Sequence, residues 1–230
     1  MSKESRPEPG FHRGFYTFLT ELSKNNNRDW FQKNKTRYDT QVRDPSLEFI
    51  RGVGPRLRHL SAQVDADPRP VGGSMMRIYR DLRFSKDKRP YRTSVGIHFS
   101  HVRSGSMGES LPGFFLHLEP GENYVASGMW RPDPPQLRKI REAIAERSSE
   151  WKKTLGVLPE LEGDSLQRPP PGFDPQHPLV RDLKRKDFIT SVAIKDAEVV
   201  RSNFPAHFLA KCTSINPLNR FLAQAVDIPW

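Results

Sequence analysis

The spacing of apolar residues changes twice along this chain of 230 residues, and no other feature of the sequence limits its fold as strongly. Up to about residue 64, apolar residues recur every three or four positions, as on one face of a helix. From residue 75 to residue 130 they alternate with polar residues or form short runs between glycines, which indicates strands. After residue 133 the helical spacing returns. Helices, then strands, then helices again predict an α+β fold.

Three helices are predicted before residue 65. The first is indicated by apolar residues that end before the segment SKNNNRD: Phe15, Phe18, Leu19 and Leu22. A second is expected from Trp30 to Val42. In the third, Asp44 is the expected N-cap and Pro45 the first helical residue. Its apolar stripe continues to Val64.

Strands are predicted in the centre of the chain, at residues 75–84, 94–102, 113–120 and 123–130, with a fifth at 187–194. Neighbouring strands in the centre are joined by short connections with glycine-rich turns. We therefore expect a central, mostly antiparallel sheet.

A helix is expected after Asp133, its N-cap, with one apolar face: Leu137, Ile140, Ile144 and Trp151. Two C-terminal helices are expected, from about Ala197 to Lys211 and from Pro217 to Val226. The sequence thus predicts a flexible N-terminal arm at residues 1–10 and a single α+β domain at 11–230. In this domain, N-terminal helices precede the sheet and C-terminal helices flank it.

The composition excludes several classes of protein. The single cysteine, Cys212, excludes an internal disulfide and a multi-cysteine zinc site, and we expect it to be a buried thiol. The chain contains no Walker loop, no dinucleotide-binding glycine motif and no serine nucleophile elbow. It has no apolar signal core at its start and no apolar run long enough to span a membrane. We expect a cytoplasmic protein without a membrane partner.

The positive charge of the chain is concentrated in one region. The net charge is +10, and eight basic and two acidic residues between Arg77 and Arg103 contribute +6 of it. Six basic residues recur there at intervals of three: Arg77, Arg80, Arg83, Lys86, Arg89 and Arg92. Such local charge indicates an anionic partner, although basic stretches are also common on solvated surfaces.

A strand at residues 75–84 would place Arg80 on the apolar face, where a guanidinium needs a carboxylate or a bound anion. Arg77, Asp81 and Arg83 would share the opposite face, and Asp81 could orient either arginine toward a ligand. Pro90 argues against one continuous element, so tertiary structure must gather these charges. Two interpretations stay open: an anion site with further contacts from Lys88 and Tyr91, or a network of ion pairs that stabilises the sheet.

The same stretch carries the pattern RxxRDxRFxxDKxPY, formed by Arg77, Arg80, Asp81, Arg83, Phe84, Asp87, Lys88, Pro90 and Tyr91. With this pattern and segments such as GFFLHLEPG and SGMWRPDP, the chain resembles a widespread bacterial family of conserved hypothetical proteins of unknown function. The resemblance extends from about Phe15 to the C-terminal helices. It implies a cytoplasmic domain, and it implies no reaction, cofactor or catalytic residue.

His117 and Glu119 are two positions apart on a predicted strand, so both side chains point to one face. A histidine beside a carboxylate can act as a general acid or base, and Asp81 and Tyr91 are the other catalytic candidates. His98 on the neighbouring strand could complete a metal site with them. The alternative that we favour is a solvent-exposed face or hydrogen-bonded histidines of the sheet, so no metal site is predicted.

Two further features are candidates for ligand binding. Lys184 and Lys186 form a second cationic cluster that could line the same site, or could instead mark an exposed helix end. Trp130 could stack on a ring of a ligand, or could instead pack in the core.

Three functions are compatible with these patterns. We rank first a site for a small anionic ligand, a phosphate or a carboxylate, which could belong to an enzyme. A nucleic-acid-binding module ranks second, because contacts along a nucleic-acid backbone do not need arginines in motif-like order with aspartates and aromatic residues. A structural or partner-binding protein with an internal Arg–Asp network is the third. The sequence predicts neither a cofactor nor an oligomeric state.

Overall fold

The computed structural model describes residues 10–83, 86–104 and 110–230, so the predicted N-terminal arm lies almost entirely outside the described residues. The N-terminal part is helical, as predicted, with these elements: α1 (Arg13–Lys24), α2 (Arg28–Lys33), α3 (Lys35–Tyr38), the π-helical turn η1 (Asp39–Arg43) and α4 (Asp44–Leu57). The second predicted helix is thus divided into three short elements.

The predicted N-cap of the third helix is wrong. Asp44 has helical backbone angles (φ −63°, ψ −44°), because the chain enters α4 directly from η1 without an extended residue. An N-cap needs a non-helical residue that accepts a hydrogen bond from the first turn. Asn27 has that role in α2, where its side chain accepts a hydrogen bond from the Trp30 N–H at 2.9 Å.

Four antiparallel strands form one sheet in the order β1-β2-β3-β4: β1 (Val95–Phe99), β2 (Gly113–Glu119), β3 (Glu122–Met129) and β4 (Phe188–Ile194). β2, β3 and β4 lie within about a residue of predicted strands, whereas β1 ends at Phe99, three residues before the predicted end. In register, His98 lies opposite Phe115, and His117 lies between Gly96 and Tyr124. The predicted α+β class, with helices before and after a central antiparallel sheet, is confirmed.

The prediction of a regular strand at residues 75–84 is wrong. Met75 forms a single bridge to Ile97 at the free edge of β1, and Tyr79 then forms a bridge to Tyr91 instead. The chain thus leaves β1 and pairs with its own return, so residues 77–83 and 86–92 form the two arms of an irregular hairpin, the basic hairpin. Residue 84 lies outside the described residues. The predicted alternation nevertheless holds from residue 77 to residue 83, where even-numbered residues are more buried than odd-numbered ones.

The C-terminal part contains five helices among the described residues: α5 (Pro134–Glu146), α6 (Ser148–Leu155), α7 (Val180–Leu183), α8 (Asp196–Val199) and α9 (Phe204–Ala225). Asp133 caps α5, as predicted, in a capping box with Gln136. Trp151 is not on this helix but on α6, because the backbone leaves the helical conformation at Arg147.

The two predicted C-terminal helices are wrong in their division. The chain forms the short α8 and then one long helix, α9, which continues through Pro217. A proline removes one helical hydrogen bond, and here the residues around it are buried on both sides, so packing outweighs that loss.

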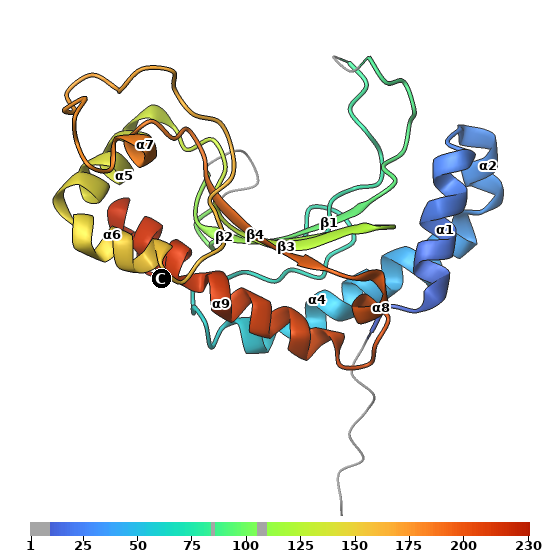
Figure 1. The fold of residues 1–230 in the computed structure, drawn as a ribbon. Coiled ribbons are helices and arrows are strands. Elements are labelled where there is room, and N and C mark those ends of the chain that lie inside the picture. Colours follow the sequence, from blue (N-terminus) through green and yellow to red (C-terminus); the bar gives the residue numbers. More distant parts are fainter. Residues whose placement is uncertain (1–9, 84–85, 105–109) are drawn as a thin grey trace, which may run out of the picture.

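The core lies between the sheet and the helices that cover one of its faces. Figure 1 shows α4 and α9 on this side, and the Ser127 hydroxyl of β3 donates a hydrogen bond to the Ile215 carbonyl of α9 at 3.1 Å. The first half of α9 packs with α1, α4 and the sheet, and the second half packs with α5, α6 and α7. Cys212 is buried in the first half, as predicted. None of the helices described is long and apolar enough to cross a membrane.

Candidate functional site

The face of the sheet turned away from α9 carries several of the predicted chemical side chains. We call it the uncovered face, and it consists of alternate residues of the strands: Gly96, His98, Phe115, His117, Glu119, Tyr124, Ala126, Ser191 and Ala193. Figure 1 shows two irregular segments on this side of the sheet. The basic hairpin lies beside β1, and residues 159–165 lie beside β4, where Glu162 forms a bridge to Ile189.

The predicted pair of His117 and Glu119 lies on this face. The two side chains approach to 3.4 Å between Nε2 and Oε2, which is long for a hydrogen bond. The other carboxylate oxygen of Glu119 accepts a hydrogen bond from the Thr93 hydroxyl at 2.8 Å. The His117 ring stacks on Tyr124, with centroids 4.8 Å apart and planes at 13°. The imidazole is therefore held on two sides, beside a carboxylate that could accept its proton.

His98 is exposed on the neighbouring strand and lies against Phe115, with ring centroids 4.6 Å apart. Protein atoms around the ring, and then the positive charge of Arg92, lower the pKa of His98. The described residues contain no group of three or more side chains placed to hold a metal ion. For His98, His117 and Glu119, the alternative that the sequence left open, the register places His98 opposite Phe115 and not opposite His117.

Three arginines of the basic hairpin, Arg80, Arg83 and Arg89, form ion pairs with aspartates of the hairpin. Arg80 Nη1 lies 2.5 Å from Asp87 Oδ2, and Arg89 Nη2 lies 2.7 Å from the same oxygen. Hydrogen bonds from Arg89 and then from Arg80 hold the pKa of Asp87 far below its usual range. The half-buried Arg80 thus has the carboxylate that its inner position requires, and the interpretation as an ion-pair network has a physical basis.

Asp81 forms a second, exposed pair on the hairpin. It accepts a hydrogen bond from Arg83 Nη2 at 2.7 Å, and this bond, with a smaller effect of the Arg77 charge, lowers the pKa of Asp81 to about 2. Of the two arginines that Asp81 was predicted to contact, Arg77 and Arg83, it forms hydrogen bonds with Arg83. Lys88 is exposed and donates a hydrogen bond from Nζ to the Leu82 carbonyl at 3.2 Å, across the hairpin.

Tyr91 lies in the core and not on the uncovered face. Its side chain is 2% exposed and stacks on Phe31, with ring centroids 4.1 Å apart. Its backbone N–H donates a hydrogen bond to the side chain of Asn26 at 3.0 Å. Burial raises the pKa of its hydroxyl. These contacts fix the return arm of the basic hairpin against Phe31 of α2 and place the Tyr91 ring in the core.

The remaining candidates are spread over the surface. Lys184 and Lys186 flank Arg185, which is buried and pairs with Asp182 at 3.2 Å next to the end of α7. This is the arrangement expected for the helix-end interpretation. Trp130 is 64% exposed after β3, and the Arg131 guanidinium lies over its ring at 5.0 Å. It is free of core packing, and no contact within the described residues joins it to the side chains of the uncovered face.

Two residues are more important than the sequence suggested. Arg92 is half-buried, and its Nε is buried without a hydrogen-bond partner among the described residues. The sequence showed Arg92 as the last of the six regularly spaced basic residues. It did not predict that Arg92 lies near His98, because the path of the chain after Pro90 could not be predicted. Asp187 is 3% exposed and accepts hydrogen bonds from the N–H groups of Arg131 and Asp164, both at 2.8 Å. It anchors the segment beside β4, which no sequence pattern indicated.

The comparison with protein families gives one match over most of the chain. Residues 14–221 match the family described as conserved hypothetical protein (DUF2461). The match includes the helices that precede the sheet, all four strands and nearly all of α9, so the chain belongs to this family. No curated protein matches the chain.

Proposed function

We propose that this member of the DUF2461 family binds a small ligand with a carboxylate or phosphate group on the uncovered face, next to Arg92. The observation that carries the proposal is the buried Arg92 Nε without a hydrogen-bond partner among the described residues. A partly buried guanidinium with an unused donor loses hydration that only an acceptor can replace. A ligand oxyanion would supply this acceptor, and it would also neutralise the charge that acts on His98.

The surroundings of Arg92 support a ligand with a flat apolar part. The rings of His98, Phe115 and Tyr124 lie on the same face, where a planar group could stack on them. The small side chains of Ala126 and Ala193 lie beside these rings in the strand register. We infer a ligand with one anionic group and one planar apolar or aromatic group.

The carboxylates on and beside this face do not exclude an anion, because Glu119 and Glu162 have polar partners and Glu122, opposite Glu119 at the start of β3, is exposed to solvent. Glu119 accepts a hydrogen bond from Thr93 and lies beside His117. Glu162 accepts a hydrogen bond from the Ser191 hydroxyl on the β4 side. The basic hairpin adds seven basic and two acidic residues, and this excess would attract an anion toward Arg92. In this proposal Arg77, Arg80, Arg83 and Lys88 act mainly through their charge.

The same geometry offers a route to catalysis. His117 lies beside Glu119 on the same face as His98, so an imidazole could take or give a proton to a bound ligand. We propose His117 as the acid–base group and Glu119 as its positioning residue. Asp81 is removed from this chemistry by its bonds to Arg83, and Tyr91 by its burial.

Native mass spectrometry of the gently purified protein tests the binding site, followed by calorimetric titration with benzoate and phenyl phosphate. We expect Arg92→Gln to lose a co-purified anionic adduct and to weaken binding of the better probe about tenfold or more, since a hydrogen bond to a charged group contributes about 1.5–3 kcal/mol. Arg51→Gln is the matched control. It removes the same charge from an exposed position on α4, on the covered side of the sheet.

Two results would contradict the proposal. The first is a wild-type protein that carries no anion and binds neither probe. The second is equal weakening in Arg92→Gln and Arg51→Gln, which would mean that only net charge matters. If that equal loss were accompanied by steep salt dependence with short RNA or DNA, nucleic-acid binding would become the better interpretation.

A further inference from the structure

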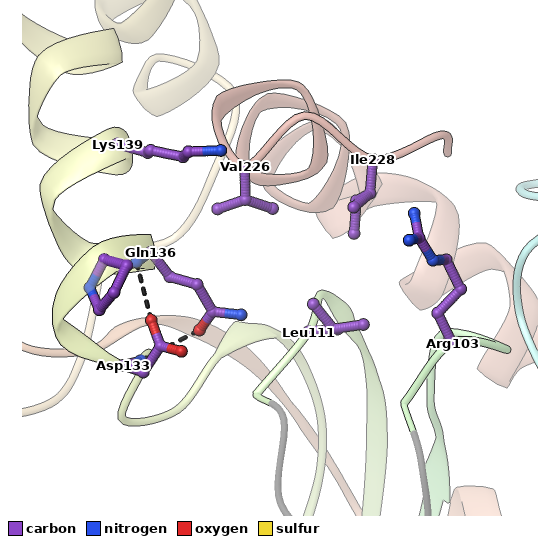
Figure 2. A pocket seen from close by; sticks show the side chains of 8 residues that line it. Arg103, Leu111, Asp133, Gln136, Lys139, Val226 and Ile228 are labelled. Carbon is purple, nitrogen blue, oxygen red and sulfur yellow. Dashed lines mark hydrogen bonds between the residues drawn. The ribbon is translucent and has the colours of Figure 1, made fainter.

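Two hollows lie beside α5, away from the uncovered face. Figure 2 shows the first, of about 190 Å³, with Arg103 across from the start of the helix. The polar groups of its helix side already have partners. Asp133 accepts a hydrogen bond from the Gln136 N–H, and Lys139 pairs with Asp227 at 2.8 Å. This hollow therefore does not call for a ligand.

The second hollow is larger, about 410 Å³, within the range of small-molecule sites. One wall is formed by Arg138, Arg141 and Glu142 of α5, and the other by the turn at residues 170–173. The turn is closed by a hydrogen bond from the Phe173 N–H to the Pro170 carbonyl at 3.4 Å, with Gly172 at φ +86°. One wall of the hollow is thus cationic, and the other is largely apolar.

Arg141 differs from the cations around it. Its side chain is buried, with the residue 8% exposed, and its Nε has no hydrogen-bond partner among the described residues. Arg138 pairs with Glu142 at 2.8 Å, and Arg185 pairs with Asp182 at 3.2 Å. Arg141 pairs with no carboxylate in the described part of the chain, and its Nη2 donates only to the Arg185 carbonyl at 3.0 Å.

A buried cation without a counter-charge is costly, and a structural role does not require one here. A neutral side chain could fill the same space, and the amide of a glutamine could donate a hydrogen bond to a carbonyl oxygen. Burial also lowers the pKa of Arg141, as expected for a charge without an acidic neighbour. An oxyanion from outside the chain would remove this cost, because a guanidinium can present a second N–H edge to it.

We propose that the hollow beside Arg141 is a second ligand site, which takes an amphiphilic anion. Its carboxylate or phosphate group would contact Arg141, and its apolar body would lie against Pro171 and Phe173. This site is independent of the one at Arg92, because α5 and the turn at residues 170–173 contribute nothing to the uncovered face.

Phenyl phosphate is the probe, with phenol and inorganic phosphate as its two halves, in titrations of the ¹⁵N-labelled full-length protein. We expect saturable shifts of the Arg141 Nε–H signal and the Phe173 amide signal with phenyl phosphate, and weaker shifts with either half. Arg141→Met should weaken the binding that the Phe173 signal reports by about tenfold or more. Arg181→Met is the control, because it removes the same charge from an exposed residue of α7.

The outcomes separate this site from the first. Arg92→Gln should leave the Phe173 shifts unchanged, whichever way the test at Arg92 ends. No saturable shift at Arg141 in the wild-type protein would overturn the proposal, and this measurement does not depend on any variant folding. Persistence of the Phe173 shifts in Arg141→Met would overturn it too. A Tm of Arg141→Met equal to or above that of the wild type, without ligand, would support a role in binding rather than in stability.

Discussion

The two faces of β2 differ in burial, although the residues that form them alternate along one strand. Phe114, Leu116 and Leu118 point to the covered face and are at most 2% exposed. Phe115 and His117 alternate with them, point to the other face and are only partly buried. The covered side chains are explained by core packing with α4 and α9. The uncovered rings are not needed for that core, and partly exposed aromatic and imidazole rings are what a bound ligand could cover.

The largest effect on stability is expected at Leu116, and its neighbour Phe115 on the other face of β2 provides the comparison. Leu116→Ala should lower the free energy of unfolding by about 2–5 kcal/mol, because it leaves a cavity in a fully buried layer. Phe115→Ala removes a larger side chain from a partly exposed position, and we expect a smaller loss of about 1–2 kcal/mol. Urea denaturation of both variants measures the difference, with the folded baseline checked by circular dichroism. Equal losses would mean that both faces are core.

The sequence predicted the helices and strands correctly where the local pattern of apolar residues determines the element. The alternation in β2 and the spacing in α1 reflect which side of an element is buried, and such patterns are visible in a short window. The predictions were wrong where contacts between residues far apart in the sequence determine the local structure. The chain at residues 75–83 pairs with two different partners, and Pro217 is tolerated because α9 has buried residues along its whole length. The extent of a single domain over residues 11–230 stays a prediction.

The candidate site was less predictable than the fold. The sequence placed His117 and Glu119 on one face, and the alternation placed Arg80 on the inner side of its segment. It did not show that Asp87, rather than Asp81, reaches Arg80, because that contact depends on how the hairpin folds back. A signal for Arg141 did exist, since it lies four positions after Leu137 and three before Ile144, on the apolar side of α5.

A smaller effect on stability than that of Leu116→Ala is expected in the basic hairpin, where Asp81 and Asp87 can be compared. Asp87 accepts hydrogen bonds from two arginine side chains and Asp81 from one, so Asp87→Asn should lower the Tm more than Asp81→Asn. Both changes should amount to a few degrees at most, because the Asp81 pair is exposed and the Asp87 pairs are still partly in contact with solvent. Thermal unfolding at pH 7 followed by circular dichroism gives the order.

The pH dependence of the same pairs has a definite sign. The pKa of each aspartate is lowered in the folded protein, so its stabilising effect is present above the unfolded pKa of about 4 and is lost as the pH falls toward the folded value. Asp87→Asn should therefore destabilise the protein most at pH 7, and its difference from the wild type should shrink steadily as the pH falls below about 4. A larger effect of Asp81→Asn at pH 7 would contradict the hairpin geometry and would restore Asp81 as the organising carboxylate.

The smallest effect on stability is expected from His98. This side chain lies on the uncovered face and can be protonated, so its effect depends on pH. Its pKa is lowered, first by the protein around the ring and then by Arg92, so the unfolded chain binds more protons between the lowered value and about 6.5. In this window stability should fall as the pH falls, and His98→Gln should make that dependence weaker. NMR titration of the His98 ring measures the pKa directly, and Arg92→Gln should raise it by removing the second cause.

The same titration links His98 to the proposed ligand. An anion bound at Arg92 would offset the positive charge that lowers the His98 pKa, so saturating benzoate or phenyl phosphate should raise that pKa in the wild type. In Arg92→Gln the pKa is already raised, and the probe should change it little. A wild-type His98 pKa that does not respond to the probe, while binding is seen elsewhere, would mean that the uncovered face is not where the anion binds.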